Sequence, residues 1–471
     1  MKKKLAHNLS ANTIQLVINH LFGVLIFYVL SVGLDKNTFG ELNLALAVPL
    51  AAFNILSFGI DQVVIKKVAE GCDIKNILSL YAFHVILTGL LFFLVLLFAR
   101  LALSDVNQLS RLVLLIGIGK LMIFFSTPLK QVTSGLERFK LLSYMLIVSN
   151  IVRGVCLALL ALFHVLTIQN ITWIFIAGDT LELLTCIILF KRYVGVAIIP
   201  RWNKPAYFQL LKQSLPQVGV VLITSALARF DWLFIGFMVS AIKLAEYSFA
   251  YKIFEISTLP LLAIAPILIP RFTRLFKGDD YKQVDLKLLL RFEIIIAALT
   301  GLLLNVCWNP IIDLLTHGKY GAVNSNVILI LSFCLPFMYL NNFYWTIFFV
   351  QNQLKMIFRS FVLTFTINVI GDIVLIPFFK NEGAAIAFLL ACFVQAFFYA
   401  SKNKHKELNN ITLTVATCIA GAVTSGFLTR LLIHNIYLSV LCAVIFYFVF
   451  LLITAQIKLG DRKGLLNLLN W

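Results

Sequence analysis

The chain has 471 residues, of which 61% are hydrophobic and 13% are charged, and its formal net charge is +18 at pH 7. Soluble domains carry about 25% charged and about 45–50% apolar residues, so this composition excludes a soluble protein. The apolar residues form continuous runs of about 20, long enough to cross a hydrocarbon core roughly 30 Å thick, and this continuity excludes the alternating strands of a membrane β-barrel. We therefore predict an all-α, polytopic helical membrane protein.

About fourteen transmembrane helices are predicted along the chain. They cover residues 10–32, 40–63, 76–99, 111–135, 141–164, 171–190, 214–240, 247–269, 292–315, 323–350, 359–379, 383–401, 411–432 and 436–456. The long polar connection at about 191–213 separates two lobes of six helices. The predicted domains are 1–198 for helices 1–6, 199–404 for helices 7–12, and 405–471 for helices 13 and 14 with a cytoplasmic tail. The polar stretch after the first lysines predicts no cleavable signal.

The stretch 39–67 suggests an internal repeat. It opens at Phe39-Gly40, continues as an apolar run of membrane-spanning length, and ends at two lysines. Shifted by 205 positions, its small and acidic start and its basic stop coincide with those of 245–274. Repeats of this kind are typical of transporters built from two related halves, so we expect the two lobes to be pseudo-symmetric.

Lysine and arginine set the expected orientation. With the N-terminus in the cytoplasm, 27 of the 39 basic residues fall in cytoplasmic segments and 7 in outer loops. This is the bias that the positive-inside rule describes, and it places both termini in the cytoplasm. It also explains the high net charge, because basic cytoplasmic loops face an anionic lipid leaflet, and no nucleic-acid partner is expected.

The sequence carries no motif for covalent chemistry. There is no P-loop, no zinc-protease motif, no nucleophile elbow and no glycine-rich nucleotide loop. The eight cysteines are scattered singly, which suggests neither a metal site nor a disulfide framework. We predict a protein that is not an enzyme and that holds no cofactor and no metal.

Ionisable residues at membrane depth are the candidate functional residues, because each is energetically expensive there and usually faces a cavity or a partner. Five are cations and five are acids, so the tally alone gives no net charge. They are Lys120, Lys130, Arg153, Arg229 and Lys252, and Asp179, Glu182, Asp231, Glu255 and Asp372.

Spacing relates some of these residues to one another. Asp179 and Glu182 share a helix face, so they either pair with Arg153 of the preceding helix or offer a carboxyl for a coupling proton. Arg153 shares its own face with Asn150, which indicates a polar stripe. Lys130 is expected near the inner end of its helix, where its side chain can reach the membrane surface.

In the second half of the chain, the spacing does not decide how the ionisable residues are paired. Lys252 and Glu255 are three residues apart and can neutralise each other. Arg229 and Asp231 are two apart and point in different directions, so each needs another helix or water. Asp372 is either a protonation switch or an inert neutral acid.

The first predicted helix carries an amide stripe. Asn8, Asn12, Gln15 and Asn19 step by four, three and four residues, which places them on one face. Such a stripe cannot face lipid. It either lines a path for sugar hydroxyls or joins helices together.

Several short motifs resemble those of the polysaccharide-biosynthesis flippases, the Wzx type within the MATE-like multidrug/oligosaccharidyl-lipid/polysaccharide superfamily. The resemblance covers the whole chain, although its motifs are degenerate. They are Phe39-Gly40, Phe58-Gly59-Ile60-Asp61, Leu215-Pro216, Arg229-Phe230-Asp231, Ile235-Gly236, the run from Glu246 to Lys252, Pro270-Arg271, Asn368 before Pro377, and the run from Gly383 to Ala387.

The resemblance implies two six-helix lobes that open alternately around a central vestibule. The implied cargo is an undecaprenyl-pyrophosphate-linked oligosaccharide, moved from the cytoplasmic to the periplasmic leaflet of the bacterial inner membrane with H⁺ or Na⁺ as coupling ion. A polysaccharide polymerase complex and the membrane lipids are implied partners. The candidate substrate-binding residues are Arg153, Arg229, Lys252, Lys120, Asn12, Asn19 and Asn150, and the candidate coupling residues are Asp179, Glu182, Asp231 and Asp372.

Other functions remain open at this point. A MATE-type multidrug/cation antiporter shares the architecture and needs acids in its lobes, which Asp179, Glu182 and Asp372 could supply. A membrane-embedded glycosyl or acyl transferase needs catalytic acids in its loops, and the outer loops offer only isolated ones. The lipid II flippases of the same superfamily carry an arginine-rich first helix, whereas the first helix here has no arginine, which argues against that branch.

Overall fold

The computed structural model of the chain is helical, and within the part that it describes there is no strand, which confirms the all-α prediction. Ten of the described helices are long and apolar enough to cross a membrane. The structure describes residues 2–102, 108–197, 199–200, 202–261, 268–269, 272–273, 286–405, 408, 411–433, 435–458 and 461, without the side chains of 2–14, 16, 99, 101–102 and 216–229.

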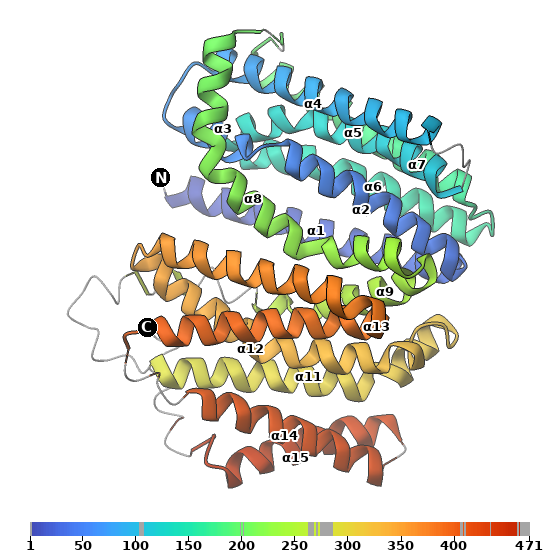
Figure 1. Cartoon of the computed structure of the whole chain (residues 1–471), viewed down its shortest axis with the longest axis vertical. Helices are drawn as coiled ribbons and strands as arrows, with labels where there is room; N and C mark the ends of the chain where they lie inside the picture. The colour runs from blue at the N-terminus through green and yellow to red at the C-terminus, as the bar shows by residue number, and fades with distance from the viewer. Residues whose placement is uncertain are drawn as a thin grey trace. The chain divides into compact units, whose positions relative to one another are not determined.

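The chain divides into two compact units, and Figure 1 follows them from blue to red. Unit 1 is Met1–Gly236 with Ser240–Ala245, and unit 2 is Phe237–Val239 with Glu246–Trp471. The predicted division at 198/199 lies earlier in the chain and stays a prediction. The helices of unit 1 are α1 (Lys2–Gly33), α2 (Lys36–Leu56), α3 (Ile60–Ala69), α4 (Ile74–Ala102), α5 (Gln108–Gly135), α6 (Phe139–Leu162), α7 (Ile168–Tyr193) and most of α8 (Lys204–Met238).

The start of α9 (Ala241–Ser257) belongs to unit 1 and the rest of α9 to unit 2. The further helices of unit 2 include a pair that lies side by side at the C-terminal end of the chain, α14 and α15 (Figure 1). These further helices are α11 (Leu286–Thr316), the 3₁₀ helix η2 (Ala322–Asn324), α12 (Ser325–Val350), α13 (Leu354–Lys402), α14 (Ile411–Leu432) and α15 (Ile436–Ile453).

The segment predicted at 40–63 is two helices rather than one. Helix α2 ends at Leu56, whose carbonyl hydrogen-bonds with Nε2 of the buried His84 at 2.8 Å. Phe58 and Gly59 then have left-handed φ angles of 52° and 66°, a conformation that glycine adopts without steric cost. Helix α3 starts directly afterwards at Ile60. The motif Phe58-Gly59 is therefore the turn that breaks the apolar run.

Helix α13 is a hairpin of two helices. At Lys380 the backbone has φ 52° and ψ −123°, which is not helical. The two arms correspond to the predicted segments 359–379 and 383–401. A side chain at Gly383 would place Cβ 2.5 Å from the carbonyl oxygen of Leu375, so only glycine allows the arms to approach this closely.

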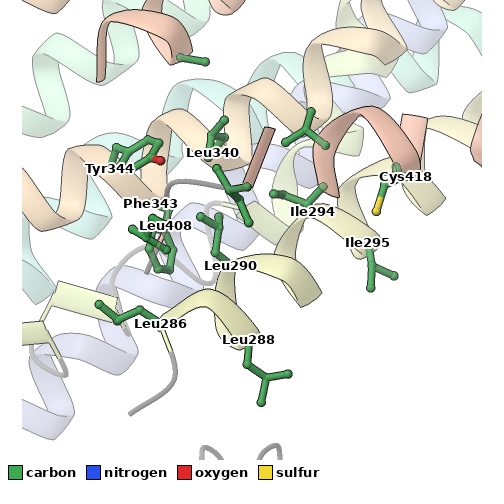
Figure 2. Packing of buried hydrophobic residues seen from close by; sticks show 14 of the residues in the cluster. Leu286, Leu288, Leu290, Ile294, Ile295, Leu340, Phe343, Tyr344, Leu408 and Cys418 are labelled. Atoms are coloured by element: carbon green, nitrogen blue, oxygen red, sulfur yellow. The ribbon is translucent and has the colours of Figure 1, made fainter. Parts of the chain in front are cut away.

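The core of unit 2 gathers apolar side chains from the helices α11 to α15, and Figure 2 shows part of it. Leu290 and Ile294 of α11 belong to the same buried cluster as Leu340 and Phe343 of α12 and Cys418 of α14. Each of these side chains is less than one-tenth exposed. This packing, rather than hydrophobicity toward lipid, fixes the faces that α11 and α12 turn to each other.

Asp35 caps α2, and its removal is expected to destabilise the start of this helix. Its carboxylate accepts a hydrogen bond from the backbone N–H of Thr38 at 3.0 Å. Hydrogen bonds from Thr38 lower the pKa of Asp35. We expect Asp35→Ala to lower the free energy of unfolding by about 1 kcal/mol, and Asp35→Ser to lower it less because serine keeps an acceptor.

The sign of the pH dependence follows from the lowered pKa of Asp35. A group whose pKa is depressed by folding stabilises the protein above its unfolded pKa and loses this effect as the pH falls through its folded pKa. The difference in unfolding temperature between wild type and Asp35→Ala should therefore be full at neutral pH and shrink in acid. A difference that grows in acid would contradict the capping role.

Candidate functional site

Unit 1 holds a buried ionic network in which Asp179 of α7 serves two cations. Its Oδ2 atom lies 2.9 Å from Nζ of Lys120 on α5, and its Oδ1 atom lies 2.6 Å from Nη2 of Arg153 on α6. The first contact is a hydrogen bond, whereas the second is an ion pair without hydrogen-bond geometry. The Asp179 side chain is 1% exposed. Of the two interpretations for Asp179, the structure thus shows pairing with Arg153.

A second ion pair lies one helical turn further along α7. Lys130 of α5 pairs with Glu182, and the hydroxyl of Ser149 on α6 donates a hydrogen bond to the same carboxylate. All three residues are buried. The expectation that Lys130 reaches the membrane surface is therefore wrong. Helix α5 continues to Gly135, so Lys130 lies more than a turn inside the helix, opposite an acid that sequence spacing did not assign to it.

Small residues bring the three helices close enough for these contacts. A Cβ on Gly119 would lie 2.9 Å from Oδ2 of Asp179, and a Cβ on Gly178 would lie 3.0 Å from Cγ of Arg153. The ring of Phe175 lies beside both cations, with its centroid 5.5 Å from Nζ of Lys120 and 5.3 Å from Cζ of Arg153. The aromatic face adds cation–π attraction, which strengthens where water is excluded.

The network has one more positive than negative charge. Its three cations, Lys120, Lys130 and Arg153, face the two carboxylates of Asp179 and Glu182. Lys120 is the most accessible of the cations, with 14% of its side chain exposed. Unbalanced charge at membrane depth is costly, so an anion that binds near Lys120 and Arg153 would neutralise the surplus. The arrangement is therefore suited to hold an anionic group.

The amide stripe of the first helix meets this network. Nδ2 of Asn150, one turn before Arg153 on α6, donates to Oδ1 of Asn19 on α1 at 3.0 Å. Gln15 on the same face is buried. At Asn19 the amide therefore joins two helices, which is one of the two interpretations of the stripe. The backbone of Asn12 belongs to α1, and its side chain lies outside the described residues.

Four of the other predicted residues have contacts of their own that the structure describes. Lys252 and Glu255 of α9 form an ion pair at 2.7 Å, as their spacing allowed. Asp231 of α8 is buried and accepts from the backbone N–H of Trp232 at 2.8 Å. Asp372 of α13 is buried and accepts from Nδ2 of Asn368 at 3.2 Å. The side chain of Arg229 lies outside the described residues.

One buried acid was missed by the sequence analysis. Glu293 falls at the very start of the predicted segment 292–315 and was not included among the acids at membrane depth, but α11 begins at Leu286 and places Glu293 two turns inside the helix. It is 3% exposed. The periodicity of Leu286, Leu290 and Ile294 could have revealed the earlier start of the helix.

Comparison with known proteins places the chain in a family. The sequence profile described as "Polysaccharide biosynthesis protein" matches residues 5–276, which is more than half of the chain and includes the whole ionic network. The chain belongs to the polysaccharide biosynthesis protein family. Among curated proteins, none matches the sequence.

Solved structures share the fold of this family member at low sequence identity. The inward closed conformation of the lipid II flippase MurJ is similar with a TM-score of 0.73 and 13% identity, covering 94% of this chain and 98% of the other. An inward-facing multidrug resistance MATE family transporter of the MOP superfamily is similar with a TM-score of 0.62 and 12% identity, and the match covers 86% of this chain and 99% of the other. The D35N mutant of the MATE transporter VcmN from Vibrio cholerae is similar with a TM-score of 0.56 and 12% identity, and the match covers 85% of this chain and 96% of the other.

These likenesses show which fold the chain has. The neighbours in fold are a lipid II flippase and MATE family transporters, and the chain shares their fold. The apolar helices of this family member, ten of them long enough to cross a membrane among the described residues, fit a multi-pass membrane protein. The resemblance read from the sequence motifs is confirmed. At 11–13% identity the likeness in fold does not extend to the substrate.

Proposed function

We propose that the protein is a flippase that moves an undecaprenyl-pyrophosphate-linked oligosaccharide repeat unit from the cytoplasmic to the periplasmic leaflet of the bacterial inner membrane. The observation that carries this proposal is the surplus cation in the buried network of Lys120, Lys130 and Arg153 with Asp179 and Glu182. A pyrophosphate is an anion that such a surplus attracts. The polysaccharide biosynthesis family supports a saccharide cargo.

The network suggests how the pyrophosphate is received. While the site is empty, Asp179 keeps Lys120 and Arg153 paired, so neither cation is left alone at membrane depth. An arriving phosphate competes with Asp179 for the same donors, and the guanidinium of Arg153 offers it a planar fork of N–H groups. Lys120 and Arg153 therefore exchange Asp179 for the phosphate when the cargo binds. They return to Asp179 when the cargo leaves, so binding stays reversible and the cargo can be released at the other leaflet.

The remaining parts of the proposal concern topology and coupling. Both termini lie in the cytoplasm, and the two lobes open alternately to the two leaflets. Transport is coupled to H⁺ or Na⁺, for which the buried carboxyls of Asp231 and Asp372 are candidates. Asp179 and Glu182 are less suited because each is held by a cation. Arg229, Lys252 and Asn12 remain candidate contacts to the cargo, and a polysaccharide polymerase complex is the proposed partner.

Reconstitution tests the proposal against the MATE-type alternative. The purified protein in liposomes receives a fluorescent oligosaccharide on a polyprenyl pyrophosphate, and an impermeant glycosidase outside reports how fast the cargo changes leaflet. We expect protein-dependent exchange of this lipid and none of the same oligosaccharide on an uncharged lipid. Efflux of a cationic dye without any exchange of the lipid would favour an antiporter instead.

Arg153→Gln separates anion attraction from folding. The substitution leaves Asp179 paired with Lys120, so the fold is retained, but it removes the surplus positive charge. We expect the leaflet exchange of the pyrophosphate lipid to slow by about tenfold or more, since a hydrogen bond to a charged group contributes about 1.5–3 kcal/mol. Lys191→Gln, at the exposed end of α7, is the matched control and should exchange at the wild-type rate. Unchanged exchange in Arg153→Gln would contradict the proposed anion site.

A further inference from the structure

Glu293 of α11 is an acid that the ionic network does not use. Its residue is 3% exposed, and neither carboxylate oxygen has a hydrogen-bond partner in the part of the chain that the structure describes. The other buried acids of the candidate site each hold a cation. A carboxylate without donors or counter-charge is strongly disfavoured in an apolar core, so Glu293 holds its proton in this conformation.

The helices around Glu293 offer one group that can respond to its charge. The hydroxyl of Tyr339 on α12 is also buried without a hydrogen-bond partner among the described residues, and Tyr339 interacts electrostatically with Glu293. The hydroxyl of Tyr447 on α15 is engaged, because it donates to the backbone carbonyl of Ile295 at 3.2 Å. The other ionisable groups on this part of α11, α12 and α14 are Arg291, which pairs with Asp461 at 2.6 Å, Tyr344 and Cys418.

A cavity lies between the helices that carry these two side chains. It has a volume of about 210 Å³ and lies between α11, α12 and α14, all within unit 2. Its wall reaches Ala298 on α11 and Pro336 on α12. Ala298 is five residues from Glu293, a rise of about 7.5 Å, and Pro336 is three residues from Tyr339, a rise of about 4.5 Å. Along their own helices, Glu293 and Tyr339 are therefore one to two turns from the nearest lining residues, and neither of the two lines the cavity itself.

Polar groups follow the cavity away from Glu293. Nδ2 of Asn305 donates to Oγ of Ser332 at 2.6 Å, and Nη2 of Arg430 donates to the carbonyl of Asn305 at 3.0 Å. Arg430 is exposed at the end of α14. These groups can hydrogen-bond water, which an apolar cavity cannot retain. The predicted topology places Arg430 on the outer side of the membrane.

We infer that Glu293 is a proton-binding site, which exchanges its proton with water through the cavity between α11, α12 and α14. On release, the O–H bond of the carboxyl breaks, the proton passes to cavity water, and the remaining carboxylate accepts a hydrogen bond from Tyr339. A proton needs only the carboxyl of Glu293 itself, whose two oxygens have no hydrogen-bond partner among the described residues. The inference rests on the proposed function only in making this proton the coupling ion.

Chemical labelling tests proton binding without any substrate. Dicyclohexylcarbodiimide modifies protonated carboxyls in apolar surroundings, and peptide mass spectrometry of the labelled full chain locates the product. We expect Glu293 to be labelled at neutral pH and progressively less as the pH rises, whereas the exposed Glu70 stays unlabelled. A Glu293 that is unlabelled at every pH, or labelled equally at every pH, would overturn the inference.

Reconstitution tests whether this proton is coupled to transport. We expect the wild type to move the pyrophosphate-linked lipid faster in a pH gradient, and Glu293→Gln to move it at one rate with or without the gradient. Glu293→Asp, which keeps the carboxyl, should retain the response. A normal gradient response in Glu293→Gln would overturn the coupling role and identify Glu293 as a permanently neutral acid. Absence of all lipid movement in the wild type would instead overturn the proposed function, while the labelling result still decides proton binding.

Discussion

Asp179→Asn is expected to lower the free energy of unfolding by about 3–5 kcal/mol, because it breaks a buried ion pair by removing one partner. The carboxylate of Asp179 is the shared counter-charge of Lys120 and Arg153, which come from two other helices. The amide of asparagine can accept from one cation, but its NH₂ group then faces the other. Two cations at membrane depth are thus left without adequate compensation.

The measurement is the unfolding temperature of the purified protein in detergent, followed by tryptophan fluorescence. A matched control is Glu70→Gln, which removes the acid of an exposed pair with Lys66 on α3, whose side chains are 55% and 76% exposed. Exposed pairs contribute about 0–1 kcal/mol, so this control should be nearly silent. Equal unfolding temperatures for wild type and Asp179→Asn would show that the network does not stabilise unit 1.

A combined variant checks the physical reason for this loss. Replacing Lys120 and Arg153 with Met together with Asp179→Asn removes the acid and both of its cations, and apolar replacement of a buried ionic group is often neutral or stabilising. We expect this variant to regain most of the stability lost in Asp179→Asn, but not the transport of a pyrophosphate lipid. Recovery of transport would contradict the anion-binding role.

Gly40→Ala is expected to destabilise unit 1 by about 2–3 kcal/mol, the upper part of the range for overpacked sites. A Cβ at this position would lie 1.8 Å from the carbonyl oxygen of Ala241 and 2.5 Å from its carbonyl carbon. These are backbone atoms, which cannot rotate away as the end of a side chain can. The start of α2 would have to move away from the start of α9, and the gain in helix propensity of about 1 kcal/mol does not offset this.

Gly23→Ala is the matched control for Gly40→Ala. Gly23 also lies within a helix, α1, but a Cβ there would meet no described atom within 4 Å. Alanine should therefore stabilise α1 slightly, by up to about 1 kcal/mol. The unfolding temperature of both variants in detergent gives the comparison. A Gly40→Ala protein at least as stable as Gly23→Ala would mean that α2 and α9 do not approach as closely as described.

Much of the fold could be predicted because its signals are local. Continuous apolar runs locate helices such as α5, and the turn at the end of α13's first arm follows from polar residues before Gly383. The break between α2 and α3 was not predicted, because Phe58 has no turn propensity of its own. Its left-handed backbone is followed by the left-handed backbone of Gly59. The end of α2 just before it is held by a hydrogen bond to His84, which is 28 residues away along the chain.

Less of the candidate site could be predicted. Arg153, Asp179 and Glu182 stand out in the sequence because charge at membrane depth demands a partner. The partner of Glu182 did not follow, because Lys130 is 52 residues away along the chain and the two meet only through the packing of α5 against α7. Glu293 was missed because the predicted helix began at residue 292, which put this acid at a helix end, whereas α11 begins at Leu286.

The sequence by itself determined that this chain is built from many helices of membrane-spanning length, that its charged residues inside the helices need compensation, and that it belongs to the polysaccharide biosynthesis protein family. These properties follow from composition, from the length of apolar runs and from motifs within single helices. The tertiary structure decided which cation meets which acid, that three cations share two acids in the network, and that Glu293 has no counter-charge among the residues that the structure describes. Such properties depend on distances between helices that lie far apart along the chain, and no local pattern encodes those distances.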